Sequence, residues 1–207
     1  MKIELPKQNN YEIAFNSAAD LLRKADMNEV AERCGAQWEG DSLRLRYFNS
    51  DCRILFPEVS FDPPAISLAE KILVLHYLTS RESHPAKGEF VAYKNLPSAS
   101  FYNPTYRKRG TNRVLSAFGS RPEVLWELAG MLGAGRAEYG DVSLRIPVFP
   151  KIDAIVLIYR GDEEFPPEAE FLFKDDIISY LSLEDVAVLA GTIASRLIRV
   201  QKQREQR

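Results

Sequence analysis

The segments of this sequence that are typical of β-strands come in pairs, and helical segments separate the pairs. Apolar residues alternate with arginine over residues 43–47, as in a half-buried strand, and Arg53–Val59 is the expected partner after a turn at Asn49–Asp51. Asp141–Phe149 and Ala154–Tyr159 predict a second hairpin. Paired strands without regular strand–helix alternation indicate an α+β fold with short, mostly antiparallel sheet segments rather than a doubly wound fold.

Helical spacing of apolar residues predicts about six helices packed with these sheets, of which the C-terminal one is long. Ser67 and Ser182 each begin a capping box, in which a serine and an acid three residues later bond each other's backbone. Asn103 followed by Pro104 predicts a third start, with an amide cap and proline at the first helical position. The expected helices are Tyr11–Arg23, Asn28–Arg33, 67–78, Asn103–Phe118, 120–132 and 182–200, with a short one at Asp175–Leu181.

The chain has 207 residues, a formal net charge of −2 and 45% hydrophobic residues, which is the composition of an ordinary globular protein. No stretch rich in glycine, serine or proline divides it, so we expect a single α+β domain over residues 1–207. The corner Asp62-Pro63-Pro64 marks residues 1–64 as a candidate N-terminal subdomain. The near-neutral charge gives no reason to expect nucleic acid or a membrane surface as a partner.

The sequence has two cysteines and two histidines, and their spacing does not match that of the common metal sites. Cys34 and Cys52 lie in no Cys-x-x-Cys motif, and His76 and His84 do not complete a set of four ligands, so no zinc and no iron–sulfur cluster is expected. Unpaired thiols favour a reduced, cytoplasmic location. The N-terminus is polar and the apolar stretches are too short to span a bilayer, which predicts a soluble intracellular protein.

His76 stands in the most apolar of the predicted helices and is the candidate with the most chemical potential. Its imidazole could be the axial ligand of cobalt or iron in a flat macrocycle, with the neighbouring Tyr77 in the same site. The simpler interpretation, which we favour on general grounds, is a neutral core histidine whose ring N–H bonds a backbone carbonyl. His84, beside Pro85 in a polar segment, is expected to be an exposed bystander.

Aromatic and basic residues are interleaved in the segment from Phe101 to Arg109, with Arg113 one helical turn later. Such a mixture suits a phosphate, a carboxylate or a stacked planar ligand. The residues that would carry this binding are Phe101, Tyr102, Tyr106, Arg107 and Arg109. An equally good interpretation is a packed aromatic face with a solvated basic face, and the slightly acidic chain as a whole argues against RNA.

A third group of candidates is acidic. Asp162, Glu163 and Glu164 precede Phe165, and Asp175 follows the next predicted strand. Paired carboxylates can bind a hard cation or perform acid–base catalysis. The segment lacks the alternating oxygen ligands and internal glycine of a helix–loop–helix calcium site, so an acidic turn is the simpler interpretation. No nucleophile, phosphate-loop or zinc-protease motif occurs in the chain, which weighs against an enzyme.

Short segments along the chain form a series that spans most of it, from about Tyr11 to Leu197. These segments are Ile72–Leu78, Gly88–Pro97, Phe101–Arg109, Gly140-Asp141, Phe149-Pro150, Gly161–Pro166, Leu172-Phe173 and Tyr180–Asp185. Taken in this order, the series resembles the prokaryotic family known as domain of unknown function 3786. That family occurs mainly in anaerobic bacteria and archaea and has no assigned activity. The resemblance therefore implies a source of this kind and no particular reaction.

Some relatives of that family are fused to a cysteine-rich module similar to that of corrinoid iron–sulfur proteins, but this chain has no such segment, so no cluster-binding role carries over. The resemblance nevertheless points towards corrinoid metabolism. The first functional hypothesis is therefore a non-catalytic binding or carrier protein for a corrinoid (cobalamin-like) or a related tetrapyrrole. His76 would bind the cobalt or line the pocket, and Arg107 or Arg109 would meet the phosphate of the ligand.

Two further hypotheses come from other classes. In the second, the chain is a protein-interaction accessory of an anaerobic redox or methyl-transfer system and docks through the apolar stripe of its last helix, Leu183–Val200. In the third, the carboxylates around Asp162 and Asp175 converge beside Arg109 and form an active site. The expected partner is thus a small-molecule cofactor or another protein.

Overall fold

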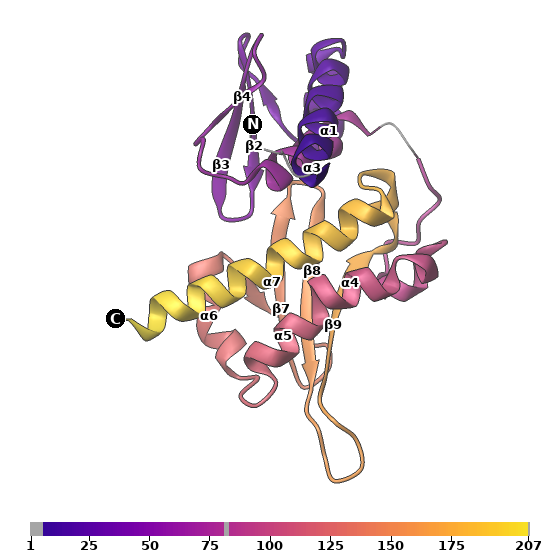
Figure 1. Ribbon diagram of the computed structural model, residues 1–207, viewed down its shortest axis with the longest axis vertical. Helices are drawn as coiled ribbons and strands as arrows, with labels where there is room; N and C mark the ends of the chain where they lie inside the picture. The colour runs from indigo at the N-terminus through magenta and orange to yellow at the C-terminus, as the bar shows by residue number, and fades with distance from the viewer. Residues whose placement is uncertain (1–5, 81–82, 207) are drawn as a thin grey trace.

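The computed structural model describes residues 6–80 and 83–206, and its fold is α+β. In this part of the chain seven α-helices pack with two antiparallel sheets, one of four strands and one of five. Figure 1 places the smaller sheet at one end of the molecule and the larger sheet, crossed by the long C-terminal helix, at the other. The fold class expected from the paired strands is therefore confirmed, and so is the long final helix.

The N-terminal part contains the smaller sheet, whose four strands form an antiparallel meander in the order β1-β2-β3-β4. Two helices precede it. Asp26 caps the second of them by accepting the N–H groups of Asn28 and Glu29. The elements are α1 (Pro6–Arg23), α2 (Met27–Cys34), β1 (Gln37–Trp38), β2 (Ser42–Tyr47), β3 (Ser50–Leu55) and β4 (Ser60–Asp62).

The single strand expected at Arg53–Val59 is divided between two strands. β3 starts at Ser50, before the expected strand, and ends at Leu55, and β4 then pairs back onto β3. The turn before β3 is correspondingly earlier than Asn49–Asp51. Pro57 accounts for the interruption, because proline has no N–H to donate to a strand ladder.

The larger sheet has the strand order β5-β9-β8-β7-β6, with antiparallel neighbours throughout. The predicted hairpin of residues 141–149 and 154–159 forms its centre as β7 and β8. These two strands are also the longest of the sheet, and β9 pairs with the free side of β8. The strands are β5 (Phe90–Ala92), β6 (Gly135–Arg136), β7 (Val142–Phe149), β8 (Ile152–Tyr159) and β9 (Glu168–Lys174).

Five further helices pack with the two sheets. They are α3 (Leu68–Thr79), α4 (Asn103–Arg109), α5 (Thr111–Phe118), α6 (Val124–Leu132) and α7 (Leu183–Glu205), with 3₁₀ turns at 93–95, 99–101 and 175–179. Both predicted capping boxes are formed, at Ser67 for α3 and at Ser182 for α7. In Figure 1, α7 runs across β7, β8 and β9, with α4 and α5 beside it.

The helix expected over Asn103–Phe118 is two helices that meet at Gly110. The corner at Gly110 lies directly against α7, since a Cβ added there would be 2.9 Å from the Cβ of Ala190. Asn103 is the first residue of α4 rather than its cap, and no side chain caps that helix. At the corner that replaces the predicted continuous helix, the backbone of Gly110 thus packs against the side chain of Ala190 where a Cβ would not fit.

The two sheets share one hydrophobic core. The N–H of Phe48, at the end of β2, donates to the carbonyl of Val148 in β7 at 2.8 Å and so joins the sheets. The ring of Tyr77 in α3 stacks on that of Phe149 with centroids 4.2 Å apart. The core of described residues continues from the N-terminal sheet through α3 to the larger sheet. The contacts of α3 therefore connect the N-terminal part to the rest of the protein.

The apolar stripe of α7 lies inside the protein. The residues that define the stripe are at most 9% exposed, and they are Val186, Leu189, Ile193, Leu197 and Val200. A surface already covered by the chain's own sheet and helices is not available for a partner. The docking face of the protein-interaction hypothesis, as formulated from the sequence, is therefore absent.

In the described part of the chain, none of the helices combines the length and the hydropathy that crossing a bilayer requires.

The corner at Gly110 yields a prediction about packing. Gly110→Ala should lower the free energy of unfolding by about 1–3 kcal/mol, because the new methyl group must displace Ala190 on α7. Gly130→Ala is the matched control, since a Cβ at Gly130 meets nothing within 4 Å. In the exposed interior of α6 that change should stabilise the protein by about 0.5–1 kcal/mol. Urea unfolding of both variants measures the difference, and equal stability of the two would contradict this account of the corner.

Candidate functional site

A groove runs between α1 and α3 on one side and α4 and α7 on the other. It consists of two adjoining cavities of about 450 and 380 Å³, which share Tyr11, Arg109 and Val188. We call the larger the His76 cavity, because His76 and Asp185 line it. We call the smaller the arginine cavity, because its lining includes Arg109, Arg113, Arg196 and Arg199. Each cavity draws residues from α1, α3, α4 and α7, so the site exists only in the folded protein.

His76 is bonded to an acid from the opposite side of the groove. Its Nδ1 lies 2.8 Å from Oδ1 of Asp185, and the pair joins α3 to α7. Asp185 is held in place because its other oxygen accepts the hydroxyl and N–H of Ser182 in the capping box. The hydrogen bond to Asp185 raises the pKa of His76 against the opposing effect of burial, and the charge of Glu184 adds to the rise. The expected bond from a core histidine to a backbone carbonyl is therefore wrong, because the ring bonds a carboxylate and is partly exposed.

The ring of His76 keeps one nitrogen for a ligand. Nδ1 is engaged by Asp185, and the side chain is 35% exposed where it lines the cavity. Nε2 is then the atom that can bind a metal centre or exchange a proton. The rest of the wall is largely apolar and includes Ala14, Ala69, Ile72 and Val188. The cavity thus combines an apolar surface with one oriented imidazole.

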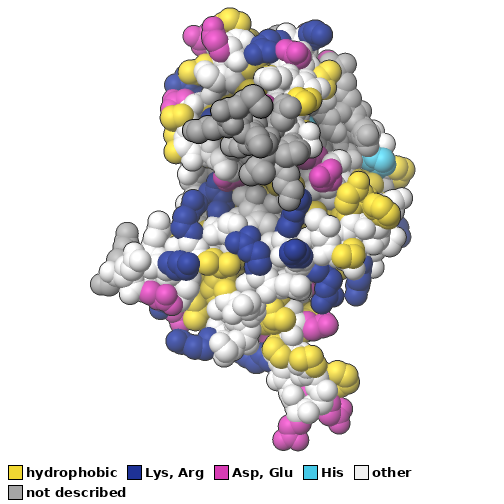
Figure 2. All heavy atoms as spheres, viewed as in Figure 1, with side chains coloured by type: hydrophobic (Ala, Val, Ile, Leu, Met, Phe, Trp, Pro, Cys, Tyr) yellow, Lys and Arg dark blue, Asp and Glu magenta, His cyan; other side chains and the backbone are white. Residues whose placement is uncertain are grey.

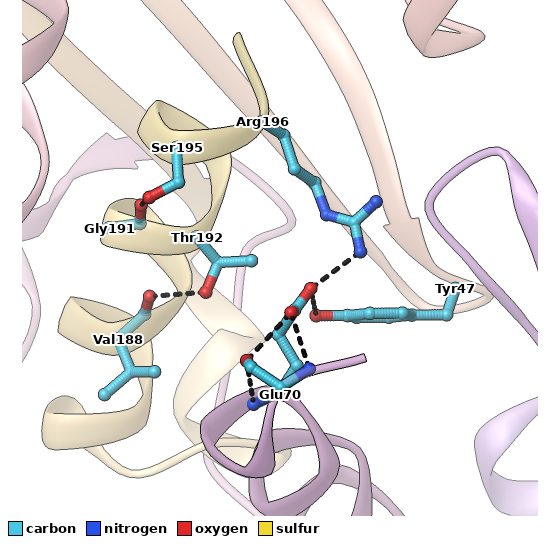
Figure 3. A network of polar contacts seen from close by, with 8 residues as sticks. Tyr47, Glu70, Val188, Gly191, Thr192, Ser195 and Arg196 are labelled. Carbon is cyan, nitrogen blue, oxygen red and sulfur yellow. Dashed lines mark hydrogen bonds and ion pairs between the residues drawn. The ribbon is translucent and has the colours of Figure 1, made fainter. Parts of the chain in front are cut away.

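The arginine cavity contains one carboxylate, and that carboxylate is already bonded. Glu70 accepts a hydrogen bond from Arg196 at 2.7 Å, from the Tyr47 hydroxyl at 3.4 Å and from Ser67 in the capping box of α3 (Figure 3). Burial raises the pKa of Glu70, but the bonds from Arg196 and Ser67 outweigh it and hold the pKa below its usual value. Arg196 also stacks over the ring of Phe48, with its guanidinium carbon 4.1 Å from the ring centre.

The other arginines of this cavity have no carboxylate partner among the described residues. Nη1 of Arg113 donates to Oγ of Ser195 at 2.9 Å and to the carbonyl of Gly191 at 3.3 Å, so its bonds are to neutral groups of α7. Nη1 of Arg109 is buried and has no hydrogen-bond partner. Figure 2 shows Lys and Arg side chains gathered across the middle of this face, where Figure 1 places α7 and α4. The middle of the face is therefore basic although the whole chain is slightly acidic.

The aromatic residues singled out in the sequence lie outside the groove. Tyr77 is buried and donates to the carbonyl of Cys34 at 2.7 Å. Tyr106 is buried as well, with its ring stacked on Tyr93 (centroids 4.1 Å apart) and its hydroxyl 2.5 Å from Glu170. Burial raises the pKa of Tyr106 well above its usual value, and the neighbouring Glu170 adds to the rise. These two tyrosines are packed parts of the core in this structure.

The remaining residues of the aromatic and basic segment point elsewhere. Phe101 is 85% exposed and meets Tyr102 edge-on, and neither lines the groove. Arg107 lines a different cavity of about 410 Å³, together with Thr111 and Tyr159. Of the seven residues proposed from the sequence for a cofactor, the groove brings together His76 and Arg109.

The acidic candidates do not converge. Asp162 accepts the N–H groups of Phe165 and Glu164, which lower its pKa, in the connection from β8 to β9. Asp175 accepts the N–H groups of Lys87 and Gly88 just after β9, and these bonds lower its pKa too. The seven residues of β9 therefore separate the two carboxylates by roughly 20 Å. The convergence beside Arg109 that the enzyme hypothesis required is not present.

The connection from β8 to β9 projects from the body of the protein, and its tip carries acidic side chains (Figures 1 and 2). Glu163 and Phe165 line a shallow surface depression there with Asp162. Phe165 is 66% exposed. This surface lies far from the groove, so the second set of predicted site residues is separate from the first.

Sequence reasoning missed Glu70, Asp185, Arg196 and Arg199. Glu70 and Asp185 were recognised only as the acids of their capping boxes, and the structure gives each a second bond across the groove. Arg196 and Arg199 stand on the polar side of the apolar stripe of α7. A local pattern cannot indicate that the polar sides of two helices face one another when their bonded residues are 109 and 126 positions apart in the sequence.

Comparison with known families agrees with the resemblance found in the sequence. The model of the family described as Domain of unknown function (DUF3786) matches residues 26–196. The chain belongs to this family. The match includes α3, α4 and most of α7, and hence most residues of the groove, whereas Asn10, Tyr11, Ala14 and Arg199 lie outside the match. Neither the comparison with curated proteins nor that with solved structures found a match to this DUF3786 chain.

The His76–Asp185 pair predicts a pH dependence of stability. Because the folded pKa of His76 is raised, its contribution is fully present below about pH 6.5, the unfolded value, and is lost as the pH rises through the folded pKa. The difference in free energy of unfolding between the wild type and His76→Gln should therefore shrink from pH 6 to pH 9. A constant difference for His76→Gln across this range would show that the pair carries no linked proton.

The Glu70–Arg196 pair predicts a large effect of removing one partner. Both side chains are mostly buried, at 18% and 16% exposure, so Arg196→Met should destabilise the protein by about 2–4 kcal/mol by leaving Glu70 without its cation. Glu70→Gln combined with Arg196→Met should recover part of that loss. Arg204→Gln, which removes an exposed pair with Glu127, should cost at most about 1 kcal/mol. Thermal and urea unfolding provide the comparison, and equal costs for Arg196→Met and Arg204→Gln would contradict it.

Proposed function

We propose that this protein is a cytoplasmic, non-catalytic binding or carrier protein for a corrinoid (cobalamin-like) cofactor or a related tetrapyrrole, which lies in the groove with His76 as axial ligand. The observation that carries the proposal is the His76–Asp185 pair, 2.8 Å apart, at the edge of an apolar-walled cavity. The free thiols of Cys34 and Cys52, both buried, are consistent with a reducing compartment.

The pair has the form that a metal-binding histidine requires. A histidine that binds a metal through one ring nitrogen generally donates its other N–H to a carboxylate, which fixes the tautomer and the orientation of the ring. Asp185 supplies that carboxylate, and its own position is fixed by Ser182. Nε2 of His76 is then the ring nitrogen left for a ligand in the cavity that His76 lines.

A lone histidine suits a metal that a macrocycle already holds. A corrin or porphyrin supplies the equatorial ligands, so the protein adds one axial donor. Among the described residues, no group of three or more His, Cys, Asp and Glu is arranged to hold a bare ion. The donor set of the groove therefore fits a metal–macrocycle better than it fits a free metal ion.

The walls of the groove suit an amphipathic ligand of this class. Ala14, Ala69 and Ile72 offer an apolar surface to the face of a ring, and Arg109 stands where the two cavities adjoin. Ligand sites commonly have volumes of about 300–1,000 Å³ with apolar walls and few polar groups. The two adjoining cavities, about 450 and 380 Å³, lie in this range, and a corrinoid would extend beyond them into solvent.

Titration with hydroxocobalamin tests the proposal. The wild-type protein should shift the visible spectrum of the corrinoid and co-elute with it on gel filtration. His76→Ala should abolish the spectral shift, and Asp185→Asn should weaken binding about 10- to 100-fold by removing the carboxylate that orients the imidazole. His84→Ala, which changes the other histidine, should bind like the wild type. Binding should also weaken at acidic pH, because a protonated His76 cannot be a ligand.

Two results would refute the proposal. One is the absence of both spectral shift and co-elution with hydroxocobalamin and with haem. The other is a spectral shift that is the same in the wild type and in His76→Ala, since the corrinoid would then be bound without His76. Circular dichroism and a thermal melt of each variant establish that it is folded before binding is compared.

A further inference from the structure

We propose that the arginine cavity is a binding site for a phosphate group, formed by Arg109, Arg113 and Arg199. This site rests on the proposed function in one respect, which is that the phosphate would belong to the ligand bound in the same groove. Its own support is the charge and hydrogen bonding of the arginine cavity, and free phosphate tests it without any corrinoid.

The first support is the balance of charge. Four arginines and one carboxylate line the cavity, and the carboxylate of Glu70 is paired with Arg196. Arg109, Arg113 and Arg199 have no carboxylate partner among the described residues. Three positive charges around a cavity of about 380 Å³ repel one another, and a bound anion relieves that repulsion. A bound anion would offset this excess of positive charge.

The second support is the buried donor on Arg109. Its Nη1 is removed from solvent and bonds to no group of the described chain. A charged donor left without an acceptor in a buried position is costly, and such groups in native proteins call for an explanation. Gly191 brings α7 close to Arg109, since a Cβ there would be 3.3 Å from that of Arg109, and so confines the arginine to the wall of the groove. An anion oxygen in the cavity would supply the missing acceptor.

The third support is that Arg113 is already oriented. Its Nη1 donates to Oγ of Ser195 and the carbonyl of Gly191, which fixes the guanidinium against α7. An arginine has five N–H donors, so others remain for a ligand while Nη1 holds the side chain. Arg199 follows Ser195 by four residues and so stands on the same face of α7. Three arginines from three helices thus surround one cavity.

The arrangement favours a phosphate over a carboxylate. A carboxylate offers two oxygens, which one guanidinium can occupy through a bidentate bond. A phosphate monoester or diester presents oxygens in several directions, so guanidinium groups on α4, α5 and α7 can each bind one. A corrinoid with a nucleotide tail contains such a group, and a free phosphate contains the same chemistry.

Calorimetric titration with inorganic phosphate, at constant ionic strength, tests the site on the full chain. The wild type should bind phosphate with a saturable isotherm and should be stabilised by it in thermal melts. Arg109→Gln and Arg113→Gln should each weaken phosphate binding by about ten- to a hundredfold, the usual effect of losing a hydrogen bond to a charged group. Acetate in place of phosphate should bind more weakly.

Lys108→Gln is the matched control, because Lys108 is an exposed neighbour of Arg109 on α4 that does not line the cavity. It removes the same charge and should change the affinity by less than about twofold. In phosphate-free buffer Arg109→Gln should be at least as stable as the wild type, because it removes an unsatisfied donor. A purely structural arginine would instead destabilise the protein when replaced and leave phosphate binding unchanged.

Three results would overturn the proposal. The first is the absence of saturable phosphate binding up to ~20 mM. The second is an equal loss of affinity in Arg109→Gln and Lys108→Gln, and the third is acetate binding as tightly as phosphate. His76→Ala should bind phosphate like the wild type, so failure of the corrinoid proposal leaves this one standing and the reverse also holds. Cobinamide, which has no nucleotide phosphate, identifies the source. If the phosphate is that of a corrinoid, hydroxocobalamin but not cobinamide should compete with free phosphate.

Discussion

Two ion pairs between α3 and α7 hold the groove in its shape. His76 with Asp185 and Glu70 with Arg196 join the helices at two separate points, because the partners are six residues apart on α3 and eleven apart on α7. The two helices therefore run in opposite directions across each other. Each pair is partly buried, so its geometry affects the stability of the protein more than that of an exposed pair does. Loss of one partner leaves an unpaired charge in a partly buried position. The cavities lie along this seam.

The acids of both pairs also cap the helices on which they stand. Asp185 bonds Ser182 at the start of α7, and Glu70 bonds Ser67 at the start of α3. A side chain that is fixed by a cap loses little further conformational entropy when it meets a partner across the groove. The same bonds that begin the helices thus orient His76 and Arg196. The capping motifs contribute to the site as well as to the fold.

Local signals were sufficient for much of the fold and for little of the site. Alternation predicted β2, the hairpin pattern predicted β7 and β8, and the serine motifs predicted the starts of α3 and α7. The break at Gly110 was not predicted, because its cause is the nearness of Ala190, 80 residues later in the chain. His76 and Arg109 were found because their residue types carry chemistry. The roles of Glu70 and Asp185 across the groove depend on contacts that no local pattern contains.

The sequence by itself determined the α+β class, the long final helix and the choice of His76 as the chemically distinctive residue, since periodicity, caps and residue type are local properties. Only the tertiary structure decided which residues share a site. It placed Tyr77 and Tyr106 in the core, Asp162 and Asp175 at opposite ends of β9, and the arginines of α4, α5 and α7 around one cavity. The reason is physical: side chains far apart in sequence meet only after the helices that carry them have packed.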